Sequence, residues 1–241
     1  MKVAIITIFP QVTELASFSI LKIAQQKGLL ELKAIDPREF THDPHRTVDD
    51  TPFGGGAGMV MKPEPLIKAI GRARDEVPEG PVLLLSPAGR QFTQQTAEEW
   101  SKLPGFTLVC GRYEGIDARV ENHVDGLVSL GDFVLSGGEL AAMAMVDAVC
   151  RLIPEVVGRE ESLQEESFVG GLLEYPQYTR PADLDGQKVP SVLLSGNHAR
   201  IAQWRRQQRL RLTWERRPDL LLNAPLGSED VKELTRIVAG Q

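Results

Sequence analysis

Apolar and polar residues along this chain fall into blocks that predict strands and helices in alternation. A continuous apolar run, typical of a strand buried on both faces, covers residues 2–8, and further strands are predicted at residues 29–35, 81–87, 106–110 and 125–130. Apolar residues recur with helical spacing over residues 19–26, 63–77, 93–103 and 138–153. Gly28 and Thr93 stand where a helix stop and an N-cap are expected. The alternation predicts an α/β fold built on a parallel sheet.

The alternation ends near residue 153. Residues 154–170 are rich in glutamate and have no clear period, which predicts a flexible linker. Helical spacing returns at roughly 196–215 and 228–239. We therefore expect a first domain over residues 1–153, the linker, and a small, mostly helical domain over residues 171–241.

Composition narrows the class of protein. The chain has 241 residues, 42% of them hydrophobic and 25% charged, as in ordinary globular proteins. No apolar run approaches the roughly 20 residues of a membrane span, and the N-terminal apolar stretch is too short for a signal peptide. Cys110 and Cys150 lie in apolar stretches without the spacing of a zinc site, and the four histidines form no metal motif. We expect a cytoplasmic protein with reduced, buried thiols.

The net charge of −6 is unevenly distributed. The segment "NHARIAQWRRQQRLRLTWERRP" contains seven arginines and a single acid, Glu215. Such a segment is either a solvated helix face or a surface for nucleic acid, and the charge alone leaves both interpretations open.

Three loops that contain glycine each follow a predicted strand, at the edge where open α/β sheets bind ligands. They are "LLLSPAGR" (83–90), "LVCGRYEGID" (108–117) and "SLGDFVLSGGELAAM" (129–143). None has the sequence of a phosphate-binding P-loop or of a dinucleotide-binding turn. Any one of them could be a tight turn between packed elements. Together, glycine bends lined by Leu, Val and Phe favour a pocket for a ligand with an aromatic body, such as adenine.

A fourth glycine-rich loop, "VDDTPFGGGAGMVM" (48–61), has four glycines within five residues. Glycines lose much backbone entropy when they become ordered, so this loop is either a linker or a segment that closes over a substrate. The flanking aspartates and apolar residues are unlike a Gly/Ser linker and favour the second interpretation.

Taken together, these motifs resemble those of the bacterial tRNA (guanine-N1)-methyltransferases of the SPOUT superfamily. The resemblance rests on the loops quoted above, extended to "LGDFVLSGGELAAMAMVDAVCRLIP", and on "SFVGGLLEYPQYTRP" and "VPSVLLSGNHARIAQWR". These segments follow the family's order, and the match extends from the first strand to about "TWERRPDLL".

The resemblance implies a parallel sheet with a deep C-terminal trefoil knot, which sequence patterns alone would not predict because knots are very rare. It implies that residues 1–153 bind S-adenosyl-L-methionine and that residues 171–241 bind tRNA. It also implies a homodimer with active sites at its interface, in which Glu166 and the C-terminal region act on the partner's cofactor. The implied cofactor-binding residues are Leu85, Ser86, Pro87, Gly111, Tyr113, Glu114, Leu130, Gly131, Asp132, Phe133, Val134, Leu135, Gly137 and Gly138.

The implied reaction is transfer of a methyl group to N1 of the guanine 3′ of the anticodon, position 37, which must leave the base stack. Guanine N1 is protonated in the neutral base, so the reaction needs a general base near N1 and a cationic group near O6. The resemblance assigns these roles to Glu166, where the family usually has aspartate, and to Arg151. It implies tRNA contacts from Asp49, Gly55, Gly56, Arg205, Arg206 and Arg209. Whether Mg²⁺ assists is left open, because the sequence contains no metal motif.

Other functions remain as alternatives at this point. Another SPOUT enzyme, such as a ribose 2′-O-methyltransferase, would use the same cofactor on a different acceptor. A non-catalytic RNA-binding protein would explain the arginines but not the three strand-end loops. A Rossmann oxidoreductase lacks its glycine fingerprint here. We expect tRNA as the partner, and neither DNA nor a membrane.

Overall fold

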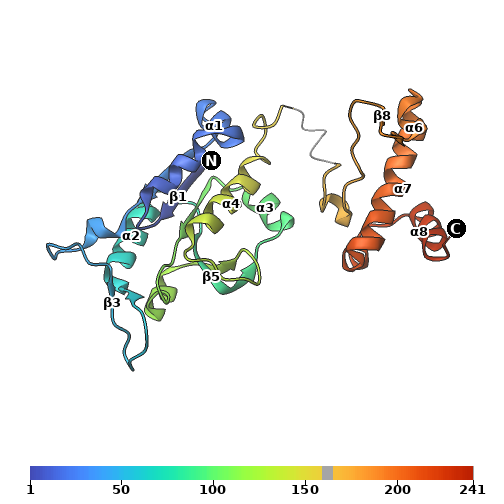
Figure 1. Cartoon of the computed structure of the whole chain (residues 1–241). Helices are drawn as coiled ribbons and strands as arrows, with labels where there is room; N and C mark the ends of the chain where they lie inside the picture. The colour runs from blue at the N-terminus through green and yellow to red at the C-terminus, as the bar shows by residue number, and fades with distance from the viewer. Residues whose placement is uncertain (159–164, 241) are drawn as a thin grey trace. The chain divides into compact units, whose positions relative to one another are not determined.

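The computed structural model describes residues 1–158 and 165–240, which form two compact units, one on each side of a division after Gly158. Each unit is described by itself below. The first runs from blue to yellow in Figure 1 and the second is orange to red. Residues 159–164, which belong to the predicted linker, lie outside the described residues.

The first unit is built on a five-stranded sheet with the order β2-β1-β6-β5-β7, and every neighbouring pair is parallel. The strands are β1 (Lys2–Ile6), β2 (Glu31–Ile35), β5 (Val82–Gln91), β6 (Gly105–Val109) and β7 (Gly126–Ser129). Strand β5 is irregular between Leu85 and Arg90, where its pairing with β7 shifts register. The predicted parallel α/β sheet is confirmed.

Helices cover both faces of this sheet because its strands are apolar on both sides. Along β1, Val3 and Ile5 belong to one hydrophobic cluster, whereas Ala4 and Ile6 belong to another. Helix α4 (Glu139–Cys150) packs with α1 (Ser19–Gln26) and α3 (Gln94–Trp100). Helix α2 (Pro63–Glu76) packs against β1 together with the 3₁₀ helices η2 (Pro37–Phe40) and η3 (Ala118–His123).

The local signals that mark helix ends are confirmed. Gly28 has φ +70° after α1, a left-handed conformation that glycine adopts without steric cost. The hydroxyl of Thr93 accepts a hydrogen bond from Thr96 N at 3.3 Å and caps α3. The pattern did not predict the 3₁₀ helix η1 (Pro10–Ser17) or the two-residue strands β3 (Asp49–Asp50) and β4 (Val60–Met61), because such short elements leave no period to detect.

The second unit is mostly helical. Its longest helix, α7 (His198–Arg216), contacts α6 (Ser191–Leu194), α8 (Ser228–Val238) and the 3₁₀ helix η5 (Pro218–Leu222). A short 3₁₀ helix, η4 (Val169–Gly171), and a two-stranded antiparallel ribbon of β8 (Asp183–Leu184) and β9 (Gln187–Lys188) precede them. None of the helices in the described part of the chain has the length and apolar content needed to cross a bilayer.

The ends of the predicted linker, residues 154–170, are held by contacts with the two units. Val156 is 3% exposed and belongs to a hydrophobic cluster of the first unit, and Lys27 Nζ donates to Glu155 O at 2.6 Å. In the second unit, Arg209 donates a hydrogen bond to Val169 O at 2.8 Å. The sequence pattern could not reveal these contacts because their partners lie far away along the chain.

Candidate active site

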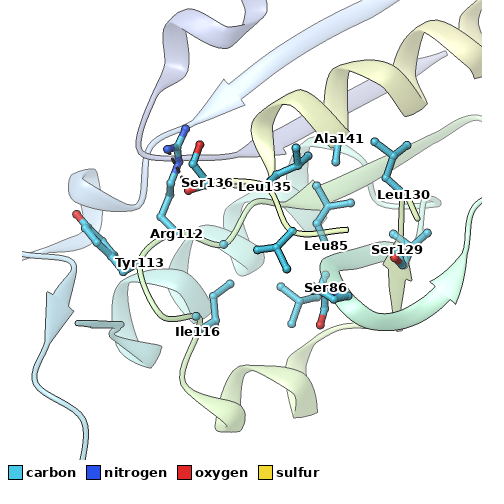
Figure 2. Close-up of a pocket in the computed structure, with 18 of the residues that line it drawn as sticks. Leu85, Ser86, Arg112, Tyr113, Ile116, Ser129, Leu130, Leu135, Ser136 and Ala141 are labelled. Carbon is cyan, nitrogen blue, oxygen red and sulfur yellow. Dashed lines mark hydrogen bonds between the residues drawn. The ribbon is translucent and has the colours of Figure 1, made fainter. Parts of the chain in front are cut away.

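A pocket of about 380 Å³ lies beside the irregular part of β5 and beyond the C-terminal ends of β6 and β7. Its walls come from residues 84–87, 111–116, 128–131 and 133–138, together with Glu121 and with Ala141 in the first turn of α4. These are the three strand-end loops that the sequence singled out. Figure 2 shows Leu85, Arg112 and Leu130, one residue from each loop, around this pocket.

All the predicted cofactor-binding residues except Asp132 line this pocket. Those that line it are Leu85, Ser86, Pro87, Gly111, Tyr113, Glu114, Leu130, Gly131, Phe133, Val134, Leu135, Gly137 and Gly138. Asp132 is exposed and is not among the lining residues. Residues from three separate loops therefore line a single pocket.

Several lining residues were not predicted. Arg112, Ile116, Ser129 and Ser136 lie inside the glycine-bearing loops, and Ala141 lies on α4 (Figure 2). The first four lie within the loops that the sequence had already assigned to the pocket, so those loops could have predicted them. Ala141 follows Gly138 by one helical turn, a spacing that would have placed it on the same side of α4.

Close backbone approach at Gly138 gives the pocket its shape. Gly138 N donates a hydrogen bond to Gly111 O at 3.0 Å and so joins two of the loops. A Cβ atom at Gly138 would lie 2.9 Å from Cys110 Cα and 3.2 Å from Leu85 Cδ1. Because the φ of Gly138 is −76°, glycine is needed here for space and not for an unusual backbone conformation.

The loop that contains Tyr113 is strained. Tyr113 has φ +61°, a left-handed conformation that is uncommon for a bulky residue, and its side chain is 49% exposed at the pocket. Gly115, two residues later, has φ +136°. Residues in such conformations cluster at binding and catalytic sites, where surrounding contacts hold them in place.

A buried ion pair supports the rim of the pocket. Arg112 Nε lies 2.9 Å from Glu139 Oε2, and the Glu139 side chain is only 5% exposed. The other carboxylate oxygen accepts a hydrogen bond from Thr7 Oγ1 at 2.8 Å. The Arg112 guanidinium also stacks on the ring of Phe9 and donates to Ser136 O at 3.2 Å. This network joins the segment just after β1, the loop after β6 and the start of α4.

The same carboxylate influences its neighbour Cys110. Burial, and to a lesser degree the negative charge of Glu139, raise the pKa of the Cys110 thiol well above its usual value. Burial also raises the pKa of Cys150, to about 11. Both thiols are free and protonated at neutral pH, so they behave as apolar packing groups rather than nucleophiles.

The residues of the pocket fit S-adenosylmethionine. Leu85, Ile116, Leu130 and Leu135 offer apolar surface to an adenine ring, and the glycines expose main-chain polar groups to its edges. Glu114 also lines the pocket, and a carboxylate there would suit the cationic part of S-adenosylmethionine. The volume lies within the range of about 300 to 1,000 Å³ that is common for small-molecule sites.

The glycine-rich loop is attached to the pocket at its base. Glu114 N donates to Met59 O at 3.0 Å, and Met61 N donates to Gly115 O at 2.9 Å. The tip is solvent-exposed, and the Phe53 side chain is 100% exposed. Of the predicted tRNA contacts, Asp49 lies in β3, and Gly55 and Gly56 lie in the exposed tip. The base of the glycine-rich loop is thus joined to the loop that contains Tyr113.

The two predicted catalytic residues lie in different units. Arg151 is the half-buried C-cap of α4, and its backbone N donates to Asp147 O at 3.2 Å. Glu166 is half-buried in the second unit, where its carbonyl accepts a hydrogen bond from Val169 N at 3.3 Å.

The three arginines predicted to bind tRNA all have partners within the second unit. Arg205 Nη1 donates to Glu165 Oε2 at 3.2 Å, and Arg206 forms a two-pronged ion pair with Asp230 at 2.8 and 2.7 Å. Arg209 donates to Leu173 O at 3.2 Å and Val169 O at 2.8 Å. Burial, followed by the charge of Arg206, lowers the pKa of Arg209. Sequence could count these arginines but could not reveal their partners.

Two other arginines of α7, Arg200 and Arg216, are exposed and form no ion pair with the described residues. Arg211 is also exposed and pairs with Glu215 at 2.8 Å on the same helix. The positive charge available to a ligand therefore lies at the ends of α7 more than at its centre. Within residues 1–158 and 165–240, no cluster of three or more potential metal-ligating side chains is found.

Comparison with known proteins identifies the family. A model of the family described as tRNA (Guanine-1)-methyltransferase TrmD matches residues 1–223. A tRNA (guanine-N(1)-)-methyltransferase of Dictyoglomus turgidum is 53% identical over 98% of this chain and 96% of its own length. Enzymes with the same name are 56% identical in Myxococcus xanthus, over 97% of this chain and 96% of that one, and 49% identical in Clostridium perfringens, over 97% and 99%. The chain therefore belongs to the tRNA (guanine-1)-methyltransferase family and is an enzyme of that class.

Proposed function

We propose that this enzyme transfers the methyl group of S-adenosylmethionine to N1 of the guanine 3′ of the anticodon, position 37, in tRNA. One observation carries the cofactor assignment: three strand-end loops meet in a pocket where Gly138 lies against Cys110 without room for a Cβ. The family and the names of its relatives support the acceptor. A tRNA substrate implies that the enzyme acts in the cytoplasm.

Family membership also supports a deep trefoil knot around this pocket. In our proposal, the loops at 84–87, 111–116 and 128–138 are the knotted segments that hold the cofactor in a bent conformation. The cofactor, when bound, supplies an electrophilic methyl group. The protein's own task is then to exclude water, orient the guanine and remove its N1 proton.

We assign the proton transfer to Glu166 and the stabilisation of O6 to Arg151. Removing the N1 proton moves negative charge onto O6, where a guanidinium stabilises it. Carboxylate side chains serve as general bases in many enzymes, and Glu166 has this chemistry. A positioned base of this kind typically contributes about 10²- to 10⁴-fold in rate. Side chains and the cofactor carry every step of this scheme.

We propose that tRNA is bound by the exposed glycine-rich loop, with Asp49, Gly55 and Gly56, and by the arginines of α7. Because Arg205, Arg206 and Arg209 already have intramolecular partners, they contribute to the field around α7. The exposed Arg200 and Arg216 are better placed to meet phosphates directly. This electrostatic contact should weaken steeply as salt is raised.

The test of the reaction is methyl transfer from radiolabelled S-adenosylmethionine to an unmodified tRNA transcript. We expect label at N1 of guanine 37, and none in a transcript that has adenine at this position. Label on a ribose, or on any other base, would contradict the proposed acceptor. Absence of labelling with intact cofactor binding would contradict the assignment of tRNA as the substrate.

The test of the base is Glu166→Gln, which removes the negative charge but keeps the size of the side chain. We expect the single-turnover rate to fall by about 10²- to 10⁴-fold while cofactor and tRNA affinities remain nearly unchanged. Glu166→Asp should retain much of the activity, because it restores the residue usual in the family. A Glu166→Gln enzyme within a few-fold of wild type would show that another group takes the proton.

We further propose that the enzyme is a homodimer whose subunits share each active site, with Glu166 acting on the partner's cofactor. Mixing the inactive Glu166→Gln and Gly138→Val variants should then restore activity in the heterodimers that contain one intact site. Sedimentation at micromolar concentration provides the independent check, since a monomer there would exclude the shared site.

A further inference from the structure

We propose that Glu165, Tyr175 and Arg205 form a clamp that positions Glu166 for proton removal. We call these three residues the Glu165 clamp. The inference rests on the proposed role of Glu166 as the base and adds to it the residues that hold this base in place. All the contacts that support it lie within the second unit.

The clamp converges on one carboxylate oxygen. Tyr175 Oη donates a hydrogen bond to Glu165 Oε2 at 2.6 Å, and Arg205 Nη1 donates to the same oxygen at 3.2 Å. The Arg205 guanidinium lies 4.7 Å from the centre of the Tyr175 ring, so the two donors also stack on each other. Tyr175 itself is only 7% exposed, so the surrounding packing holds its ring in place. The residue immediately before Glu166 is thus anchored by charge, hydrogen bonding and stacking.

The chain is held on the other side of Glu166 as well. Ser167 Oγ accepts a hydrogen bond from Glu174 N at 3.0 Å, and Phe168 N donates to Leu172 O at 2.8 Å. Phe168 has φ +76°, an unusual conformation for a bulky residue that a tight turn imposes here. Glu166 therefore lies between two anchored neighbours, which restricts the directions in which its side chain can extend.

Helix α7 provides the support for this segment. Arg209 donates to the carbonyls of Val169 and Leu173, and Thr213 Oγ1 accepts from Leu173 N at 2.9 Å. Thr213 is fully buried, so this contact is part of the core of the unit. The arginines at the centre of α7 thus bind the chain segment that contains Glu166, which gives them a structural task besides the attraction of tRNA.

A loosened clamp should affect catalysis more than stability. The Glu165 side chain is 49% exposed, so its removal leaves no cavity in the core. A general base, in contrast, must lie within hydrogen-bond reach of the proton it removes. Misplacement by about 1 Å can cost on the order of 10²-fold in rate.

The experiment measures single-turnover methyl transfer in Glu165→Ala and Tyr175→Phe with the full-length enzyme and tRNA. We expect rates reduced by about 10- to 100-fold, with dissociation constants for cofactor and tRNA within about two-fold of wild type. Tyr175→Phe removes a single oxygen atom and keeps the ring on which Arg205 stacks. It therefore provides the answer if Glu165→Ala is poorly folded.

The matched control is Glu233→Ala on α8. Glu233 Oε2 lies 3.2 Å from Arg236 Nη1, the same separation as in the pair of Glu165 with Arg205. Glu233 belongs to the same unit, and the hydrogen bond and ion pair it forms with the described residues join it to Arg236 on its own helix. We expect this variant to transfer methyl groups at the wild-type rate, and an equal loss in Glu233→Ala and Glu165→Ala would overturn the clamp.

A double-mutant cycle separates positioning from a general structural role. If the clamp acts through Glu166, Glu165→Ala should cause little further loss in a Glu166→Gln enzyme. Independent, multiplying losses would overturn the clamp. A slow Glu166→Gln enzyme with fully active Glu165→Ala and Tyr175→Phe variants would also overturn it, but would leave Glu166 as the base. A fully active Glu166→Gln enzyme would contradict both the role of Glu166 as the base and the Glu165 clamp.

Discussion

The functional surfaces of the two units of this enzyme are formed by different types of residue. The pocket of the first unit is lined by glycines, apolar side chains and a few polar ones such as Ser86 and Glu114, and a buried ion pair supports its rim. The second unit has little apolar core around α7 and is held by arginines that bind carboxylates and carbonyl oxygens. Sterics should therefore control substitutions in the first unit, and charge those in the second.

The largest effect should come from Gly138→Val, which tests the steric side of this comparison. The Cβ of the new side chain would lie too close to the Cα of Cys110, at 2.9 Å, and in tight contact with the side chain of Leu85. Because the φ of Gly138 suits any residue, we expect helical content to survive while the pocket is filled. Calorimetry should then detect no binding of S-adenosylmethionine.

The control is Gly126→Ala in β7, where the nearest atom to a new Cβ is Leu83 Cδ2 at an ordinary 3.6 Å. This variant should bind the cofactor as the wild type does. Unchanged cofactor affinity in Gly138→Val would remove this loop from the site and would undo the distinction between the two units.

The second effect concerns the ion pairs, which occur in both units with different burial. Arg112→Leu leaves the Glu139 carboxylate, 5% exposed, without its cationic partner. Loss of one member of a buried pair costs about 3 to 5 kcal/mol, and we expect the lower value because Arg112 is 27% exposed. Denaturant titration, with hydrogen exchange to assign the loss to α4, measures it.

Arg211→Leu is the comparison from the second unit. Arg211 and Glu215 are separated by 2.8 Å, but their side chains are 60% and 45% exposed. Such pairs contribute about 0 to 1 kcal/mol, so stability should barely change. Equal losses in Arg112→Leu and Arg211→Leu would mean that burial does not distinguish the pairs.

Much of the first unit could be predicted from sequence because its information is local. Apolar runs placed the five strands of the sheet, and Gly28 and Thr93 marked helix ends. Loops that follow parallel strands meet at one edge of the sheet, so motifs in separate segments could be assigned to one pocket.

The ion pairs could not be predicted from sequence, because their two members lie far apart along the chain. The Arg112–Glu139 pair spans 27 positions, and the contact of Arg205 with Glu165 spans 40. A count of charges in α7 left open whether the helix is a solvated face or a surface for nucleic acid, and it could not show which arginines have intramolecular partners. The sequence likewise predicted that both Asp132 and Tyr113 bind the cofactor, because it does not show which way each side chain points. In the structure, only Tyr113 lines the pocket.

Asp230 tests how much an ion pair with arginine stabilises the second unit, where we expect a smaller loss than in Arg112→Leu. Its carboxylate accepts two hydrogen bonds from Arg206 and one from Gly227 N at 2.9 Å, at the start of α8. Asp230→Ala removes both the ion pair and the cap, and we expect a loss of about 2 kcal/mol in the second unit. Hydrogen exchange in α8 should report it, whereas exchange in α4 should stay unchanged.

The pH dependence of this loss has a definite sign. Hydrogen bonds from Arg206 lower the pKa of Asp230 in the folded protein. Its stabilisation is therefore fully present above about pH 3.9, the value typical of an unfolded aspartate, and is lost as pH falls through the folded pKa. The difference between wild type and Asp230→Ala should shrink below about pH 4, and a difference that grew there would contradict the assignment.

The smallest effect comes from a glycine of the first unit that has no tight neighbour. Gly71 lies in the interior of α2, is exposed, and would place a Cβ with no atom within 4 Å. Glycine in a helix interior is less stable than alanine by about 0.5 to 1 kcal/mol, so Gly71→Ala should stabilise the first unit by this amount. Gly105→Ala, in β6, would meet Lys2 O and should destabilise the same unit. If both substitutions changed the free energy of unfolding in the same direction, space around the Cβ would not be what decides the role of a glycine in this unit.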